Sequence, residues 1–172
     1  MTQLIHIGFA ENYIAKLTNV AQSAHFGASR RQKTLHAGMY YVEANSIPHT
    51  FCSVYDSLQH GPAVMWTHLQ PVLSEILSSS HVHFFSDGPS AQYRQKLNFI
   101  FANVIQYLVQ KTAIWNFFES GQGKGIPDGI GAAVKKADDR TVLGGHDIVS
   151  AKSLYEHLLM EKSSVLHSSS SC

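Results

Sequence analysis

The segment HVHFFS at residues 81–86, closed by the turn sequence Asp87-Gly88-Pro89, predicts a short buried strand because it is apolar and bounded by turn residues. A helix with apolar residues at three- and four-residue steps is expected over residues 92–110, and AIWNFF at 113–118 predicts the next strand. The side of the helix expected to face the core carries Leu97, Ile100, Phe101, Val104, Ile105 and Leu108. Strands that alternate with helices in this way are typical of parallel pairing through right-handed crossovers.

The N-terminal half predicts a run of strands before its first clear helix. Strands are expected at residues 4–9, 34–43 and 50–55, a less regular helical pattern at 11–24, and helices at 62–77 and from about residue 128. A turn at Asn45–Pro48 sets two of these strands at hairpin distance. Pro71 is expected to kink the 62–77 helix or to reset its start. The order predicts an α/β fold: a mixed five-stranded sheet, an antiparallel meander followed by parallel strands, flanked by helices.

Length and composition narrow the class of protein. The 172 residues fit one domain, with a core over residues 1–161 and a serine-rich tail, expected to be disordered, over residues 162–172. The net charge of +1 provides no global basic field, so any contact with nucleic acid has to come from a local patch. Two cysteines, Cys52 and Cys172, exclude a disulfide scaffold. No apolar run approaches the ~18 residues of a membrane span, and the start lacks signal-peptide features. We therefore expect an intracellular protein, nuclear or cytoplasmic, with no membrane contact.

Asp87 is the first candidate for chemistry, since it directly follows a predicted strand. Ligands bind at the carboxyl ends of parallel strands, and a carboxylate at such a position suits a hard cation such as Mg²⁺. The following helix would present Gln92 and Arg94 nearby, where they could contact phosphate oxygens. The alternative is that Asp87 is a turn residue that caps this helix.

A glycine-rich loop at residues 121–125 precedes the helix predicted from about residue 128. Alternating glycines allow a backbone to approach a ligand closely, and Lys124 could supply a charge to a phosphate. The loop is not a Walker A motif, because it lacks the first glycine and the final Ser/Thr. Asp128 is either a metal ligand at the start of the helix or its N-cap. Lys135 and Lys136 on the same helix form either a small basic face for a ligand or a solvated face.

Histidines offer a weaker candidate site. His81 and His83 alternate on a predicted strand, so they share one face and could reach one metal ion, although no obvious third ligand accompanies them. Asp56 and His60 follow the third strand and either line a site or serve as turn and cap residues. A serine hydrolase is poorly supported, because the chain has no G-x-S-x-G elbow.

Several short segments, taken in order, resemble transposon-derived proteins of animal genomes. The segments are FAENY at 9–13, QSAH at 22–25, VYD at 54–56, FSDG at 85–88, QY at 92–93, GKG at 123–125, DGIG at 128–131 and KK at 135–136. The corresponding segments of that family read DFAENY, SDG…QY and HGKG..DG.GG..KR, and the similarity covers roughly residues 5 to 137. The family resembles a ribonuclease H-like transposase or integrase core.

This resemblance implies a mechanism. In such a core, carboxylates from the first strand, the fourth strand and a late helix bind two divalent ions, Mg²⁺ or Mn²⁺, which activate a water or a 3′-hydroxyl for attack on a phosphodiester. It makes Asp87 the fourth-strand ligand and Asp128 the late-helix ligand, with Glu119 as a rival for the latter. DNA is the partner that it implies, and a homo-oligomer is compatible with it. The residues expected to contact nucleic acid are Gln92, Arg94, Lys124, Lys135 and Lys136.

The chain departs from the family pattern at the position of the first-strand aspartate, which is Gly8. Loss of this carboxylate removes a charged bridge between two cations, so both should bind much more weakly. Glu11 lies three residues on and would need a backbone change to act as the missing metal ligand; Gln122 replaces the histidine of HGKG. We therefore expect a nucleic-acid-processing domain with impaired catalysis. The alternatives are a non-catalytic nucleic-acid or protein interaction module on the same fold, or a remnant without function.

Overall fold

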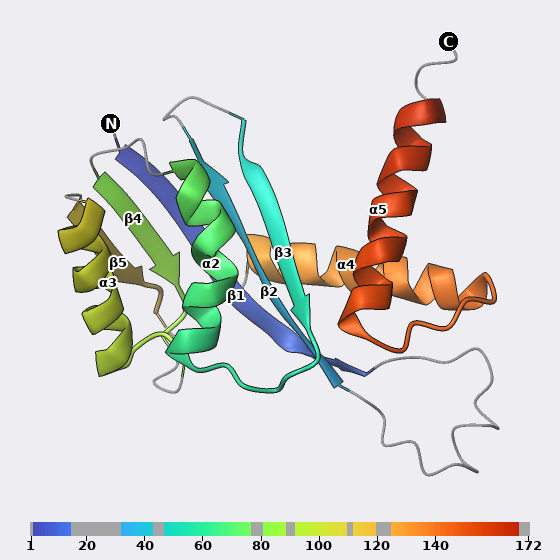
Figure 1. The fold of residues 1–172 in the computed structure, drawn as a ribbon, viewed down its shortest axis with the longest axis horizontal. Helices are drawn as coiled ribbons and strands as arrows, with labels where there is room; N and C mark the ends of the chain where they lie inside the picture. The colour runs from blue at the N-terminus through green and yellow to red at the C-terminus, as the bar shows by residue number, and fades with distance from the viewer. Residues whose placement is uncertain are drawn as a thin grey trace. The chain divides into compact units, whose positions relative to one another are not determined.

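The computed structural model describes residues 2–14, 32–42, 47–76, 81–88, 92–109, 112–119 and 125–168. The strands are β1 (Thr2–Ile14), β2 (Gln32–Tyr41), β3 (His49–Tyr55), β4 (His81–Ser86) and β5 (Thr112–Phe117). The helices are α2 (Pro62–Ile76), α3 (Lys96–Val109), α4 (Ile126–Leu143) and α5 (Ala151–Ser168). The strands form one five-stranded sheet in the order β3-β2-β1-β4-β5 (Figure 1). The predicted α/β fold, with a mixed sheet flanked by helices, is confirmed.

The two kinds of strand pairing occupy different parts of the sheet. β4 pairs in parallel with β1 on one side and with β5 on the other, whereas β2 runs antiparallel to its neighbours (Figure 1). The register places His6 of β1 beside Phe85 of β4. Because side chains alternate between the two faces of a strand, Val82, Phe84 and Ser86 are buried on one face of β4. Phe85, and Asp87 after it, therefore belong to the other face.

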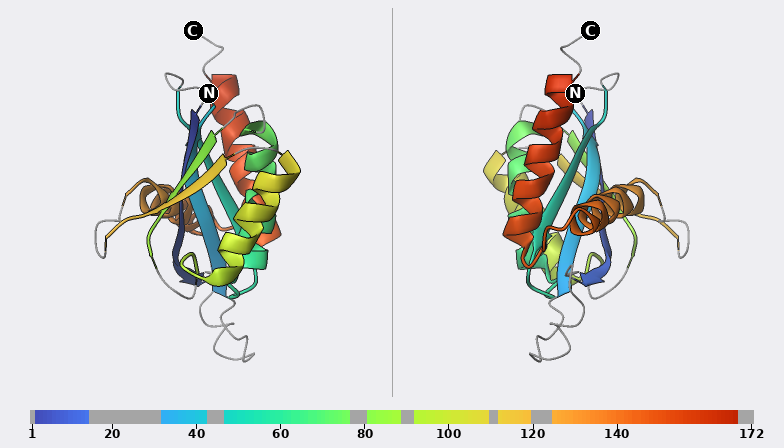
Figure 2. Two further views of the ribbon diagram at one scale, coloured as in Figure 1. Left: turned by 90° about the vertical axis from the view of Figure 1, so that its left-hand side faces the viewer. Right: turned by 90° about the vertical axis from the view of Figure 1, so that its right-hand side faces the viewer.

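The chain divides into two compact units. The first comprises residues 1–10, 36–53 and 59–131, and the second comprises residues 11–35, 54–58 and 132–172. In the first unit, α2 and α3 cover the same face of the sheet (Figure 2). Its core joins the sheet to α2, and it includes Ile5, Ile7, Met65, Trp66, Leu69 and Phe84. Ile5 and Ile7 of β1 point into this core. Gly8 and Ala10 belong to the opposite face of the strand, against which the start of α4 packs.

Helix α3 is apolar on more than one side, and its predicted orientation is wrong in part. Leu97, Ile100 and Val104 are exposed by 42%, 46% and 46%, although the spacing predicted that they face the core. Phe101 packs against the core as predicted, and Ala102 packs there as well, while the side chains of Ile105 and Leu108 lie outside the described residues. Periodicity selects a face only when the other face is polar, and Lys96 is the only charged residue of α3.

None of the described helices is both long and apolar enough to cross a membrane.

Three element boundaries differ from those expected. β1 continues to Ile14, so the helical pattern predicted from residue 11 begins as strand, and residues 15–24 lie outside the described part. α2 runs through Pro71 without a new start, and the Pro71 carbonyl accepts a hydrogen bond from Ser74 Oγ at 2.6 Å. α5 continues to Ser168, which places helical backbone in the first part of the serine-rich segment that was expected to be disordered.

The second unit is organised around a buried lysine. Lys33 of β2 is completely buried, and its Nζ donates a hydrogen bond to the backbone carbonyl of Ile148 at 2.9 Å. Burial lowers the pKa of Lys33, while the negative charges of Asp138 and Asp56 oppose that shift. Asp138 is itself fully buried on α4. Asp56 accepts a hydrogen bond from the backbone N–H of Ala151 at 2.9 Å and thereby caps the start of α5.

Candidate carboxylate site

Two carboxylates from distant parts of the sequence come together in the first unit. Asp87 is half-buried directly after β4, and Asp128 is exposed in the first turn of α4. The pKa of Asp87 is raised, chiefly by burial and then by the negative charge of Asp128, while a hydrogen bond with its own backbone opposes the shift. The structure thus sets two of the predicted metal ligands, Asp87 and Asp128, within electrostatic range of each other. A cation between them would relieve their repulsion.

Gly8 lies beside this pair, at the position where the family pattern has an aspartate. Continuing the β1–β4 register by two residues from His6 and Phe85 sets Gly8 level with Asp87. A Cβ atom at position 8 would lie 2.9 Å from Cβ and 3.3 Å from Cγ of Pro127. The ring of Pro127 is rigid and buried at the start of α4, so the helix would have to move to admit any side chain. In the present packing, position 8 therefore has no room for a side chain.

Sequence reasoning missed His6, which faces the same site. Its ring packs against Phe118 with centroids 5.0 Å apart. Burial lowers the pKa of His6, and the negative charge of Asp128 opposes that shift. Nε2 of His6 is buried and has no hydrogen-bond partner among the described residues. The available signal was strand alternation, because His6 lies two residues before Gly8 and so shares its face.

The donor set matches a divalent cation only in part. Oδ1 of Asp87 is also buried without a hydrogen-bond partner in the described part of the chain, and carboxylate oxygens suit Mg²⁺ and Mn²⁺. However, no three His, Cys, Asp or Glu side chains within the described ranges are arranged to hold a metal ion. A centre in which three carboxylates hold two cations does not fit these residues. What remains is the Asp87–Asp128 pair.

Arg94 lies beside Gly88, the residue that follows Asp87. Its guanidinium carbon is 3.7 Å from the position of a Cβ built on Gly88, the residue after Asp87. The same carbon lies 4.8 Å from the centroid of the Phe117 ring, a cation–π geometry that leaves the donors at the edge of the guanidinium accessible. Arg94 is exposed. Its position is therefore compatible with the predicted contact to a phosphate.

The other predicted nucleic-acid contacts are distributed differently. The side-chain amide of Gln92 lies 3.3 Å from Nδ1 of His60, and the Gln92 carbonyl accepts a 2.6 Å hydrogen bond from Asn98. Gln92 is thus engaged within the protein. Lys135 and Lys136 belong to the part of α4 in the second unit. Lys124 lies outside the described residues, as does Gln122, and so do the neighbouring residues of the glycine-rich loop.

The remaining candidate residues, Asp56, His81, His83, Glu119 and Glu11, are not shown to be part of the carboxylate site. Asp56 is a helix cap, the second of the two interpretations left open. His81 and His83 share a face of β4 as predicted, and no set of three ligands forms around them in the described ranges. Glu119 is exposed two residues after β5. Glu11 lies in β1, but its side chain is outside the described residues, so its role as a substitute ligand stays a prediction.

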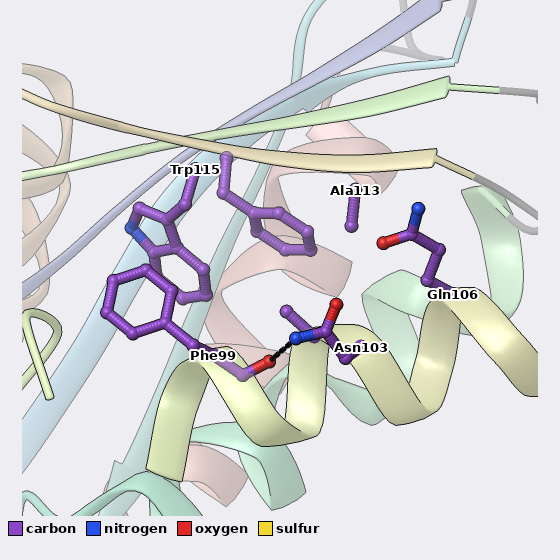
Figure 3. Close-up of a pocket in the computed structure, with 7 residues that line it drawn as sticks. Phe99, Asn103, Gln106, Ala113 and Trp115 are labelled. Atoms are coloured by element: carbon purple, nitrogen blue, oxygen red, sulfur yellow. Dashed lines mark hydrogen bonds between the residues drawn. The ribbon is translucent and has the colours of Figure 1, made fainter. Parts of the chain in front are cut away.

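A small pocket between α3 and β5 offers no competing chemistry. It has a volume of about 130 Å³ and is lined by side chains that include Phe99, Asn103, Gln106, Ala113 and Trp115 (Figure 3). Asn103 donates a 2.8 Å hydrogen bond to the carbonyl of Phe99 one turn earlier. None of the lining residues is acidic, basic or nucleophilic. The carboxylate pair therefore remains the better candidate for a functional site.

One family model matches almost the whole chain. The family model for a domain of unknown function, DUF8701, matches residues 1–169. The chain belongs to this family. No curated protein matches it. The match includes Gly8, Asp87 and Asp128, so all positions of the candidate site lie within the DUF8701 domain.

Proposed function

We propose that this DUF8701 chain is a ribonuclease H-like domain of transposase ancestry in which phosphodiester chemistry is impaired. The observation that carries the proposal is the meeting of Asp87 and Asp128 beside Gly8, whose α-carbon is closed off by Pro127. Two of the three carboxylates implied by the sequence resemblance are brought together. The third is absent, and its place is filled.

The topology supports the ribonuclease H-like part of this proposal. Its mechanism requires carboxylates from the first strand, the fourth strand and a late helix to lie close together. The order β3-β2-β1-β4-β5 makes β1 and β4 parallel neighbours, and the register sets the carboxyl end of β4 beside the middle of β1, next to Gly8. Residues at the start of α4 contact β1 at Gly8 and Ala10. The arrangement is therefore compatible with the proposed ribonuclease H-like fold.

Impairment follows from the charge of the site. Two close divalent cations need bridging carboxylates to offset their mutual repulsion, and only the Asp87–Asp128 pair is available here. One cation, Mg²⁺ or Mn²⁺, held between these two groups would be tolerated. When bound, such an ion would polarise a phosphoryl oxygen, and the exposed Arg94 guanidinium beside Gly88 would orient the same phosphate group.

Calorimetry with Mn²⁺ tests the pair directly. We expect weak binding to the natural protein, and Asp87→Asn should weaken it by at least about tenfold because a direct ligand is lost. Asp147→Asn, the same change at an exposed position of the second unit, should leave binding unchanged. Equal Mn²⁺ affinity of the natural and Asp87→Asn proteins would contradict the proposed site.

Restoring the missing aspartate tests the explanation based on Pro127. Gly8→Asp alone should not gain Mn²⁺ affinity, because its Cβ would lie 2.9 Å from Cβ of Pro127. Gly8→Asp combined with Pro127→Gly should bind Mn²⁺ more tightly than the natural chain, by about tenfold or more. Pro127→Gly alone is the control. If Gly8→Asp alone gains as much Mn²⁺ affinity as the double variant, the start of α4 shifts easily and the explanation based on Pro127 is wrong.

Nuclease assays test the impairment itself. We expect no Mn²⁺-dependent cleavage or joining of DNA by the natural protein above the level of Asp87→Asn. Cleavage that Asp87→Asn abolishes would show that the two carboxylates suffice, and the impairment would then be disproved.

A non-catalytic nucleic-acid module on the same fold is the second candidate, favoured by the closed position at Gly8 and by the basic pair Lys135 and Lys136 on α4. This version predicts DNA binding without a metal ion and with a strong salt dependence. Lys135→Gln with Lys136→Gln should reduce the slope of log K against log salt by about 2. Lys152→Gln on α5 is the matched exposed control. Absence of DNA binding at low salt would exclude this candidate.

A further inference from the structure

Three histidines of the first unit form a cluster with Phe9 on the face of the sheet that α2 covers. The Phe9 ring stacks on His60, with centroids 4.6 Å apart, and lies 4.4 Å from the ring of His36. His68 of α2 lies edge-on to His36 at 6.5 Å. The cluster thus joins β1, β2, α2 and the segment that leads into α2.

His36 is the buried centre of this cluster. Its side chain is fully buried, and neither ring nitrogen has a hydrogen-bond partner among the residues that the structure describes. Burial lowers its pKa to about 3, and His68 and His60 add to the shift. A charged imidazolium in such a place is strongly unfavourable. His36 is therefore neutral whenever the cluster is closed.

The groups that face His36 provide no compensating negative charge. They are Phe9 from β1, Phe51 from β3, His68 from α2, His60 before α2 and Tyr93 before α3. Only histidines act electrostatically on His36 among the described residues, and both oppose its protonation. Burial also lowers the pKa of His60 and of His68. Each of the three histidines is thus easier to protonate once the cluster opens.

We propose that His36, His60 and His68 form an acid-sensitive latch, which holds α2 against β1 and β2 at neutral pH and loosens it as the pH falls below about 6. His60 and His68 are partly exposed and take up protons first. Their positive charges then act on His36, beside which both lie. Opening carries His68 away with α2 and lets water reach His36, which accepts a proton only in the open state.

The direction follows from proton linkage. A histidine whose pKa is lower in the closed than in the open state stabilises the closed state above its ordinary pKa of about 6.5, and this stabilisation is lost as the pH falls. Each further pH unit shifts the equilibrium about tenfold per proton until the pKa of the closed state is reached. For His36 alone, the opening constant should rise about 30-fold between pH 7.5 and pH 5.0.

Hydrogen exchange of individual backbone amides tests the latch, after correction for the intrinsic pH dependence of exchange. In the natural protein, amides of α2 should open at least about 30-fold more at pH 5.0 than at pH 7.5, because His60 and His68 add to the contribution of His36, while amides of β4 keep their protection. His36→Phe retains a ring against Phe9 and removes the proton site, so most of the increase should disappear. His81→Phe, the same change at an exposed strand position, should retain it.

Three results would overturn the latch. One is equal loss of protection in α2 and β4 at pH 5.0, which means global unfolding. Another is no loss in α2, and the third is an unchanged pH response in His36→Phe. The comparison of α2 with β4 uses only the natural protein, so the test stands even where the His36 variant fails to fold.

Discussion

Lys33→Met is expected to destabilise the folded protein by about 3–5 kcal/mol, although methionine retains most of the volume of the lysine stem. The ammonium group of Lys33 is fully buried, and it donates to the carbonyl of Ile148 in the segment before α5. Its charge also balances Asp138, which is fully buried as well. Removing one member of a buried charge pair leaves the other uncompensated in a medium of low dielectric constant. The second unit should therefore lose much of its stability.

Unfolding in guanidinium chloride, followed by circular dichroism, measures this loss. Lys152→Met is the matched control, because Lys152 lies 84% exposed on α5 and forms only a 3.9 Å pair with Glu156; such a pair contributes about 0.3–0.5 kcal/mol. Adding Asp138→Asn to Lys33→Met should recover part of the stability, because the unbalanced carboxylate is neutralised. If Lys33→Met is as stable as the Lys152 control, the lysine is not buried with its charge.

Lys33 also shows where sequence reasoning ends. Periodicity placed a strand at 34–43, next to this residue, but a lysine at a strand boundary normally reaches solvent. Its burial depends on Asp138 and Ile148, more than a hundred residues later in the chain. The strands and helices themselves were predictable because their signals are local: short apolar runs, apolar steps of three and four residues, and turn residues between them.

In the candidate site, too, the sequence predicts the features that depend on local signals and not those that depend on tertiary packing. Asp87 and Asp128 were predictable as candidates because one follows a strand and the other opens a helix. Their electrostatic contact depends on β1 and β4 being neighbours. The lack of space for a side chain at position 8 was not predictable, since it arises from the close packing of Pro127, at the start of α4, against Gly8. His6 carried a signal in its spacing from Gly8, but only the structure shows its Nε2 buried without a partner among the described residues.

Tyr93→Ala should destabilise the first unit by about 3–5 kcal/mol, the range for loss of a large aromatic side chain from a core. Tyr93 is fully buried. Its ring lies 5.6 Å from Phe9, 6.2 Å from Trp115 and 6.4 Å from His36. It thus connects β1, β2 and β5, and the cavity left by alanine could not be refilled from one side.

The matched control is Tyr107→Ala, because Tyr107 is 84% exposed on α3; we expect it to change the free energy of unfolding by less than about 0.5 kcal/mol. The comparison bears on the sequence resemblance as well as on stability. Gln92-Tyr93 is one of the segments that carry it, and the packing of Tyr93 shows that this residue belongs to the core of the first unit. Equal effects of the two substitutions would contradict the placement of Tyr93 in the core.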